Sequence, residues 1–284
     1  AILNHNNIKC ELKFPEINTF KEGSEKAFTV EVKDQNACPR YAGLNIKNVK
    51  IEASPEWLQK RLTAIGLTPI NNLVDITNYV LHETGQPLHA FDADKIKGNA
   101  IIVQQLKEKT KFTTLDDIER ELSAEDLMIC DGKNQPMCIA GVFGGKKSGV
   151  EKETKDIFLE SAYFNPVSIR KTAKRHTLST DASFRFERSV DPNLVIYALK
   201  RAAILIQEIC QGTISSAITD LYPNKILNTE ISLSYKKVDS LIGEKIDRNI
   251  IQSILKSLDI EIIKRDEDGL HISIPPYRVD VTRE

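Results

Sequence analysis

The 284-residue sequence lacks any marked excess of charge, because 39 lysines and arginines nearly balance 40 aspartates and glutamates. The resulting net charge of −1 does not indicate a nucleic-acid-binding protein, so any contact with nucleic acid must come from local clusters of basic residues. No apolar run approaches the roughly 18 residues of a membrane-spanning helix, and no charged-then-apolar signal peptide opens the chain. We therefore expect a cytoplasmic protein without a membrane partner.

Cysteine and histidine are scarce, and their spacing matches no common metal site or disulfide framework. The five cysteines form an odd set without a C-x-x-C pair. Among the five histidines, the one that follows the His82-Glu83 pair is His89, which is the wrong spacing for an H-E-x-x-H helix. The sequence therefore indicates neither a zinc site nor a set of disulfides, and it favours a reducing environment.

The hydrophobic pattern predicts an α+β fold with a mixed or antiparallel sheet and flanking helices. Apolar residues at alternating positions indicate strands, and apolar residues three or four apart indicate helices. We expect strands at residues 28–32, 44–51 (half-buried), 100–103, 112–115, 127–130, 137–143 and 157–160, and helices at about 55–65, 73–84 and 193–210, with a further helix starting at Pro166 behind an Asn165 cap. Because strand–helix–strand repeats are few, a doubly wound sheet is not expected.

The chain divides, on this reading, into a lead-in and two domains. We place the lead-in at residues 1–37, a large domain at 38–212 and a small domain at 213–284, with an extended break near 222–224. The small domain shows a strand, two short helices and a hairpin around residues 266–269. This order of elements predicts a winged-helix-like domain.

Three polar residues, Thr77, Asn78 and His89, form the first candidate group. Thr77 lies on an otherwise apolar stripe of the helix at 73–84, and His89 lies in the extended segment that follows. One interpretation is that the three side chains face a common pocket. The alternative is that His89 is a capping or core histidine with its hydrogen bonds satisfied, and the spacing alone favours that alternative.

The segment from Cys138 to Gly145 is an apolar strand that breaks into glycines. Glycine has no Cβ, so backbone N–H groups in such a segment can approach a ligand closely. The alternative is a strand followed by a flexible turn. A phosphate loop of the G-x-x-x-x-G-K-[ST] type is excluded, because Lys147 stands in the last position and Ala140 stands where the first glycine belongs.

The stretch from Ile157 to Pro192 carries the third group. Its apolar strand ends in Glu160, a carboxylate that is costly to bury without partners. Glu160 is therefore either exposed or held for a ligand hydroxyl group. The helix after Pro166 carries four basic residues, which either contact phosphates or form a solvated face: Arg170, Lys171, Lys174 and Arg175.

Taken in their order along the chain, these segments closely resemble the editing domain of the β-subunits of bacterial phenylalanyl-tRNA synthetases. The segments that carry the resemblance are PRYAGL (39–44), VDITNYV (74–80), GQPLHAFD (85–92), IAGVFGG (139–145) and the string from Glu160 to Pro192. The resemblance covers roughly residues 38–210, and the residues from about 213 resemble the small domain that follows in the same subunit. It implies that the chain is a piece of a longer subunit.

The resemblance implies that the large domain hydrolyses tyrosine wrongly attached to tRNA(Phe). It implies catalytic roles for His89, Thr77 and Asn78, which orient the aminoacyl ester and the attacking water. It implies that Glu160 accepts a hydrogen bond from the tyrosine hydroxyl group and that Gly141 lends a backbone donor. The remaining implied substrate-binding residues are Ala140, Pro87, Thr180 and Ala182, and Arg170, Lys174 and Arg175 are the candidates for tRNA contacts.

The resemblance also implies partners and cofactors. The partners are tRNA(Phe) and the α-subunit of an α2β2 enzyme, and Mg and ATP serve the whole enzyme rather than the editing site, where no cofactor is expected. Asp280 matches the first ligand of a magnesium-binding segment whose other carboxylates lie beyond Glu284.

Two positions depart from the family pattern: Thr177 and Ser189 stand where the family commonly has glycine. The turns at these positions are therefore expected to differ locally. The alternative function is that of a non-catalytic module that docks tRNA or the α-subunit.

Overall fold

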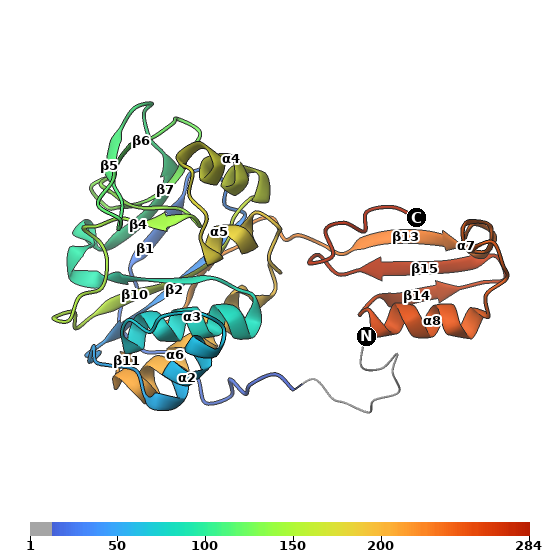
Figure 1. Ribbon diagram of the computed structural model, residues 1–284, viewed down its shortest axis with the longest axis horizontal. Coiled ribbons are helices and arrows are strands. Elements are labelled where there is room, and N and C mark those ends of the chain that lie inside the picture. Colours follow the sequence, from blue (N-terminus) through green and yellow to red (C-terminus); the bar gives the residue numbers. More distant parts are fainter. Residues whose placement is uncertain (1–12) are drawn as a thin grey trace. The chain divides into compact units, whose positions relative to one another are not determined.

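The computed structural model describes residues 13–284, which fall into two compact units (Figure 1). Residues 15–224 form the large unit, and residues 225–284 form the small unit, to which residues 13 and 14 also belong. Helices and strands are mixed in both units, so the expected α+β class is confirmed. Across the described residues, no helix is both long and apolar enough to cross a membrane.

The large unit contains two five-stranded sheets and one short hairpin. The sheet around β10 has the order β11 (Thr213–Ile214), β2 (Arg40–Lys47), β10 (Ile157–Tyr163) and β3 (Leu88–Asp92), and β12 (Thr219–Leu221) also pairs with β2. The sheet around β7 has the order β1 (Thr29–Val32), β4 (Ala100–Gln105), β7 (Leu127–Asp131), β8 (Pro136–Ile139) and β9 (Phe143–Gly144). The hairpin is β5 (Lys111–Thr113) and β6 (Glu119–Glu121). We call the two sheets the β10 sheet and the β7 sheet.

Three helices lie on the side of the β10 sheet that faces away from the β7 sheet (Figure 1). They are α2 (Glu56–Ala64), α3 (Asn72–Thr84) and α6 (Leu194–Cys210). The α6 helix contacts β10 and β2, and α3 contacts both α6 and β3. Shorter helical segments are α4 (Pro166–His176), α5 (Asp181–Phe186) and two 3-10 turns, η1 (Ala93–Lys95) and η2 (Lys97–Asn99).

The central strands of the β10 sheet are buried on both faces. All seven residues of β10 are buried, and so are residues 40–46 of β2. The half-buried strand expected at 44–51 is therefore wrong in its burial, because helices cover one face of this sheet and the β7 sheet covers the other. Asn48, which follows the last residue of β2, has a φ of 58° and ends the strand before residue 51.

Local sequence signals set both ends of α3 and the start of α4, the latter at the expected cap. The Asn71 side chain accepts a hydrogen bond from the N–H of Val74, and Gly85 ends α3 with a φ of 81°. Asn165 caps α4, and Pro166 occupies the first helical turn, where its missing N–H costs nothing.

The compact units differ from the sequence-based division in two places. Strand β1, expected in the lead-in, pairs in parallel with β4 of the β7 sheet. Strands β11 and β12, expected in the small domain, pair with β2 of the β10 sheet. The pairing partners of these strands are distant in sequence and place both segments in the large unit. The compact units therefore divide after Asn224, at the extended break expected near 222–224, rather than after residue 212.

The small unit is a three-stranded antiparallel sheet with two helices. Its elements are β13 (Thr229–Ser234), α7 (Tyr235–Ile242), α8 (Arg248–Ser257), β14 (Glu261–Arg265) and β15 (Gly269–Ile274). The strand order is β13-β15-β14, and the core includes Ile231, Tyr235, Ile251 and Ile272. This order of elements along the chain is the predicted one, and the winged-helix comparison stays a prediction.

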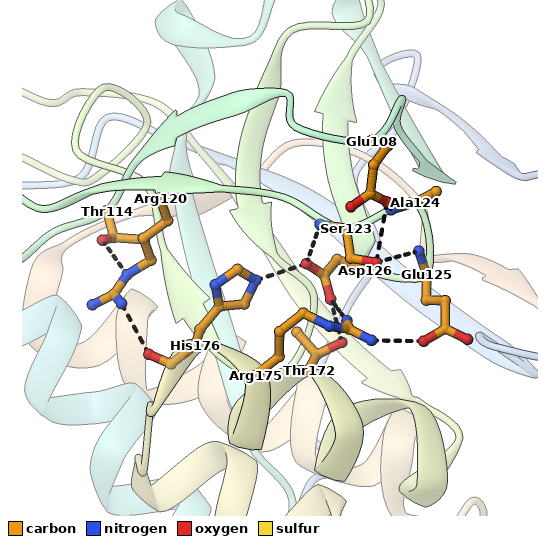
Figure 2. Close-up of polar contacts among 10 residues, drawn as sticks. All are labelled: Glu108, Thr114, Arg120, Ser123, Ala124, Glu125, Asp126, Thr172, Arg175 and His176. Carbon is orange, nitrogen blue, oxygen red and sulfur yellow. Dashed lines mark hydrogen bonds and ion pairs between the residues drawn. The ribbon is translucent and has the colours of Figure 1, made fainter.

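A buried carboxylate, Asp126, fastens α4 to the loop before β7 (Figure 2). The hydroxyl of Thr172 donates to one of its oxygens at 2.9 Å, and the Nε2 of His176 lies 2.7 Å from the other. The N–H of Ser123 donates at 2.8 Å, and the guanidinium of Arg175 forms an ion pair with the same carboxylate. Burial alone would raise the pKa of Asp126, but the hydrogen bonds from His176, Ser123 and Thr172 outweigh it and lower the pKa below its ordinary value of 3.8.

We expect Asp126→Asn to destabilise the large unit by about 3 kcal/mol at pH 7, because it removes one partner of a buried ion pair. The lowered pKa means that this contribution is present above pH 3.8 and is lost as the pH falls through the folded-state pKa. The gap between wild type and variant in urea unfolding should therefore narrow below about pH 4. The control is Glu125→Gln, which removes the exposed partner of Arg175 and should cost under about 1 kcal/mol. Equal costs for the two variants would contradict a special role for Asp126.

Thr177 and Ser189, the two departures from the family's glycines, both keep a left-handed backbone, with φ values of 54° and 71°. A β-branched residue pays about 1–2 kcal/mol in this region, whereas glycine pays mainly in unfolded-state entropy. Thr177→Gly should therefore stabilise the large unit by about 0.5–1 kcal/mol in thermal or urea unfolding. Thr177→Ala retains a Cβ and is the control. If alanine stabilises as much as glycine, backbone strain at this position is not the cause.

Candidate functional site

Glu160 and His89 lie directly opposite each other on neighbouring strands. The antiparallel register of β10 and β3 pairs Glu160 with His89, and that of β10 and β2 pairs Glu160 with Gly43. Directly opposite residues in such a ladder project from the same face of the sheet. That face is turned toward the β7 sheet, where Cys138 of β8 lies near Glu160. Burial raises the pKa of the Cys138 thiol, and the nearby Glu160 carboxylate raises it further.

The Glu160 carboxylate is almost completely buried and has one strong donor. Glu160 is 5% exposed, and the hydroxyl group of Tyr41 donates to its Oε2 at 2.7 Å. Burial raises the pKa of Glu160 to about 7, and the hydrogen bond from Tyr41 opposes that rise. Such a carboxyl group is a mixture of charged and neutral forms at physiological pH, which is typical of functional sites.

His89 is a partly buried imidazole with one ring nitrogen that has no partner. Its ring meets Phe91 edge-on at a centroid distance of 4.4 Å, and its Nε2 is buried without a hydrogen-bond partner. Burial lowers the pKa of His89 to about 4. The ring is therefore neutral at pH 7, and a ligand is the natural partner for an unsatisfied buried nitrogen.

The glycine-rich segment after β8 passes next to His89. A Cβ built on Gly144 would come within 3.3 Å of the His89 Cε1 atom. Gly141 has a φ of 66°, and a Cβ there would lie 2.8 Å from the Phe164 ring, so only glycine fits both the backbone and the space. Ala140 is fully buried beside it.

Thr180 connects this segment to α5. Its hydroxyl group donates to the carbonyl of Val142 at 3.0 Å and accepts from the N–H of Ser183, which caps the helix. Ala182 lies in the first turn of α5 and is partly exposed. The structure thus brings the segment at 140–141 and the start of α5 together.

The α3 helix borders α5 through its last turn. Arg185 of α5 lies 3.1 Å from the Nδ1 of His82, and Asn78, one turn earlier, shares that edge of α3. Asn78 is partly exposed, whereas Thr77 is 9% exposed and its hydroxyl donates to the carbonyl of Val74 in its own helix. The Thr77 hydroxyl group therefore has its partner within its own helix, while Asn78 lies on the edge of α3 that borders α5.

Pro87 is buried where the chain passes from α3 into β3, and its neighbour Gln86 ties that passage to β10. The amide of Gln86 donates to the carbonyls of Pro87 and Ala162, at 3.0 and 2.8 Å. Sequence reasoning singled out neither Gln86 nor Tyr41, although both lie inside the quoted segments PRYAGL and GQPLHAFD. The available signal was the need of a buried carboxylate for a donor.

The three basic candidates on α4 have different surroundings. Arg175 is paired with Asp126 and with Glu125, the latter at 2.6 Å, whereas Arg170 and Lys174 are exposed. Of the three, Arg170 and Lys174 are therefore exposed without an ion pair to Asp126 or Glu125.

A cleft of about 850 Å³ lies elsewhere on the large unit, between the β5–β6 hairpin and the start of β8. Its lining includes Lys95, Lys97, Lys107, Lys111 and Lys147, and none of the predicted site residues. Lys111 is paired with Glu119 and Lys95 with Glu151, each at 2.7 Å. Its volume alone does not make this cleft a site, since Glu160 and His89, whose pKa values are strongly shifted by burial, lie in the β10 sheet.

Asp280 is exposed in the segment after β15. Within residues 13–284, no three histidine, cysteine, aspartate or glutamate side chains gather as a metal site requires. The magnesium assignment to Asp280 stays a prediction.

Comparison with known proteins identifies two domains in the chain. Residues 37–211 match the model of the B3/4 domain family, and residues 231–284 match that of the tRNA synthetase B5 domain. An N-terminal fragment of the phenylalanyl-tRNA synthetase beta subunit from Pyrococcus horikoshii is a structural neighbour, with a TM-score of 0.47 and 12% identity over 93% of this chain and 73% of that one.

The sequence relatives are much more similar. The phenylalanine–tRNA ligase beta subunits of Porphyromonas gingivalis and Bacteroides thetaiotaomicron are 54% and 53% identical over the whole chain. The chain spans about a third of their length, 35% in both cases. It therefore belongs to the phenylalanine–tRNA ligase beta-subunit family and carries that family's B3/4 and B5 domains.

Proposed function

We propose that the large unit hydrolyses the aminoacyl ester of tyrosyl-tRNA(Phe) and so removes a mischarged amino acid. The observation that carries the proposal is the pairing of Glu160, a buried carboxylate, with His89, whose buried Nε2 has no partner. A buried carboxyl group with a raised pKa, opposite a buried ring nitrogen without a partner, is what a site that reads one polar group on a ligand requires.

Glu160 supplies the specificity in this proposal. An apolar pocket for phenylalanine rejects an added hydroxyl group only about 10²-fold, so a second site that tests for the hydroxyl is needed. The tyrosine hydroxyl donates to the Glu160 carboxylate, whereas phenylalanine offers no donor and leaves a buried charge poorly paired. The correct ester is therefore spared.

His89 and Asn78 act at the ester end of the ligand, and Thr77 supports that edge of α3. A neutral imidazole with a free Nε2 can accept a proton from water or hold the water by a hydrogen bond. The backbone N–H of Gly141 serves as a further donor to the ligand. The walls of the proposed pocket are formed by Pro87, Ala140, Thr180 and Ala182. The last three belong to the glycine-rich segment and to the start of α5, which contact each other.

The wider role follows from family membership and belongs to the same proposal. The chain works within an α2β2 ligase that joins phenylalanine to tRNA(Phe) in the cytoplasm, with ATP and Mg used by the whole enzyme. Arg170 and Lys174 contact tRNA phosphates in this proposal, while Arg175 forms an ion pair with Asp126. A single exposed carboxylate, Asp280, is a small part of a magnesium site, so no step of the hydrolysis is assigned to the metal.

Glu160→Ala should slow hydrolysis of tyrosyl-tRNA(Phe) by roughly ten- to a hundred-fold, the value of a lost hydrogen bond to a charged group. Hydrolysis of phenylalanyl-tRNA(Phe) should not fall, because the charge that penalised phenylalanine is gone. The measurement is deacylation of both charged tRNAs by the complete ligase at pH 7.5. Glu160→Gln, which keeps the volume, separates loss of charge from creation of a cavity. A tyrosine-to-phenylalanine rate ratio equal to that of wild type in both variants would remove Glu160 from the specificity role, whereas a wild-type ligase that hydrolyses neither ester would favour the docking alternative.

His89→Ala should slow both esters by the same factor, about 10²-fold, because the group acts at the ester end that the two substrates share. Since burial lowers the pKa of His89 to about 4, the rate of the Glu160→Gln variant, which lacks the carboxyl group that titrates near 7, should show no histidine titration between about pH 5.5 and 8. The control is His271→Ala in the small unit, whose ring pairs with Glu230 and should not affect either rate. Selective loss of the tyrosine reaction in His89→Ala would instead place this residue at the side-chain end of the ligand.

A further inference from the structure

The two oxygens of Glu160 are in different situations. Oε2 accepts the Tyr41 hydrogen bond at 2.7 Å, and Tyr41 is fully buried on β2. Gly43 lies opposite Glu160, and a Cβ at Gly43 would come within 2.3 Å of the Phe158 ring. The residue opposite Glu160 on β2 therefore has no side chain. The Glu160 carboxylate is instead contacted by the phenol of Tyr41, which lies two residues away on β2.

The titratable groups around Glu160 are neutral at pH 7. Burial raises the pKa of the Cys38 and Cys138 thiols and of the Tyr41 phenol, and it lowers the pKa of His89. Among the described residues, burial and the Tyr41 hydrogen bond account for the pKa shift of Glu160, with no contribution from a cation. The charged form of the carboxylate is therefore stabilised by one phenol rather than by an ion pair.

We propose that Tyr41 is a positioning and specificity-determining residue of this site: its hydroxyl group holds Oε2 of Glu160, so that Oε1 is the atom presented to the ligand hydroxyl. The proposal rests on the proposed function above. Through Tyr41, which lies within the PRYAGL segment, strand β2 takes part in recognising the amino-acid side chain of the ester.

The specificity follows from the protonation state. With Tyr41 present, Glu160 is ionised in a substantial part of the molecules at pH 7 and accepts a hydrogen bond from the ligand. Without that donor, the pKa of the buried carboxyl group rises and the group is mostly neutral at pH 7. When phenylalanine is bound, leaving a neutral carboxyl group unpaired costs less free energy than leaving a carboxylate unpaired. Loss of Tyr41 should therefore weaken discrimination between the two esters, and raising the pH should restore part of it.

The first test follows Glu160 itself, without any substrate. The side-chain carboxyl of Glu160 is titrated by ¹³C NMR in the chain labelled on glutamate, and its signal is assigned by its loss in Glu160→Gln. The wild-type midpoint should lie near 7, and Tyr41→Phe should move it upward by about one pH unit or more. Tyr163→Phe is the matched control, because it removes a buried phenol of β10 that pairs with Ser189 at 3.0 Å rather than with Glu160. It should leave the midpoint in place.

The second test measures deacylation of tyrosyl- and phenylalanyl-tRNA(Phe) by the complete ligase carrying the same variants. Tyr41→Phe should lower the tyrosine-to-phenylalanine rate ratio about tenfold at pH 7, with partial recovery at pH 8.5, and Tyr163→Phe should not change it. An unmoved Glu160 midpoint in Tyr41→Phe would overturn the positioning role, and a moved midpoint with an unchanged ratio would overturn the specificity role. A wild-type ligase that hydrolyses neither ester would count against the proposed function instead, while the titration would still decide whether Tyr41 holds Glu160.

Discussion

The hydrogen bond from Tyr41 to Glu160 joins the two central strands of the β10 sheet where neither side chain reaches solvent to any extent. Burying a carboxylate with one neutral donor costs free energy, so the surrounding apolar contacts must supply the stability that this group removes. The α6 helix on one face of the sheet and the β7 sheet on the other provide that cover. The doubly covered sheet is thus what allows a poorly solvated acid to persist in the fold.

A second buried carboxylate in the same unit has the opposite character. Asp126 has four partners, two of them basic side chains, and its pKa is lowered, whereas Glu160 has one phenol and its pKa is raised to about 7. The first arrangement leaves no lone pair for a ligand and stabilises α4. The second leaves one oxygen without a protein partner. The number of donors around each acid, rather than its burial, separates the structural carboxylate from the candidate functional one.

The sequence predicted the elements that local signals determine. Gly85 placed the end of α3 and Asn165 the start of α4, and the order of motifs placed Glu160 and His89 in one family site. It did not predict that both central strands are buried on both faces, that β11 and β12 return to the large unit, or that Tyr41 meets Glu160. Each of these depends on pairing between segments far apart in the chain, and Tyr41 and Glu160 are separated by 119 positions. Periodicity within a segment contains no information about such a partner.

The basic helix α4 shows how geometry resolves an ambiguity that composition leaves open. At about 100° per residue, Thr172, Arg175 and His176 share one face of the helix, and that face meets Asp126 (Figure 2). Arg170 and Lys174 lie one turn apart on the opposite face and are exposed. A count of positive charges treats the four basic residues as one cluster, yet Arg175 is held by a buried carboxylate and only the outer face is available to phosphates. In the proposed function, contacts of this helix with tRNA phosphates therefore belong to Arg170 and Lys174, because moving Arg175 to a phosphate would leave Asp126 without its guanidinium partner.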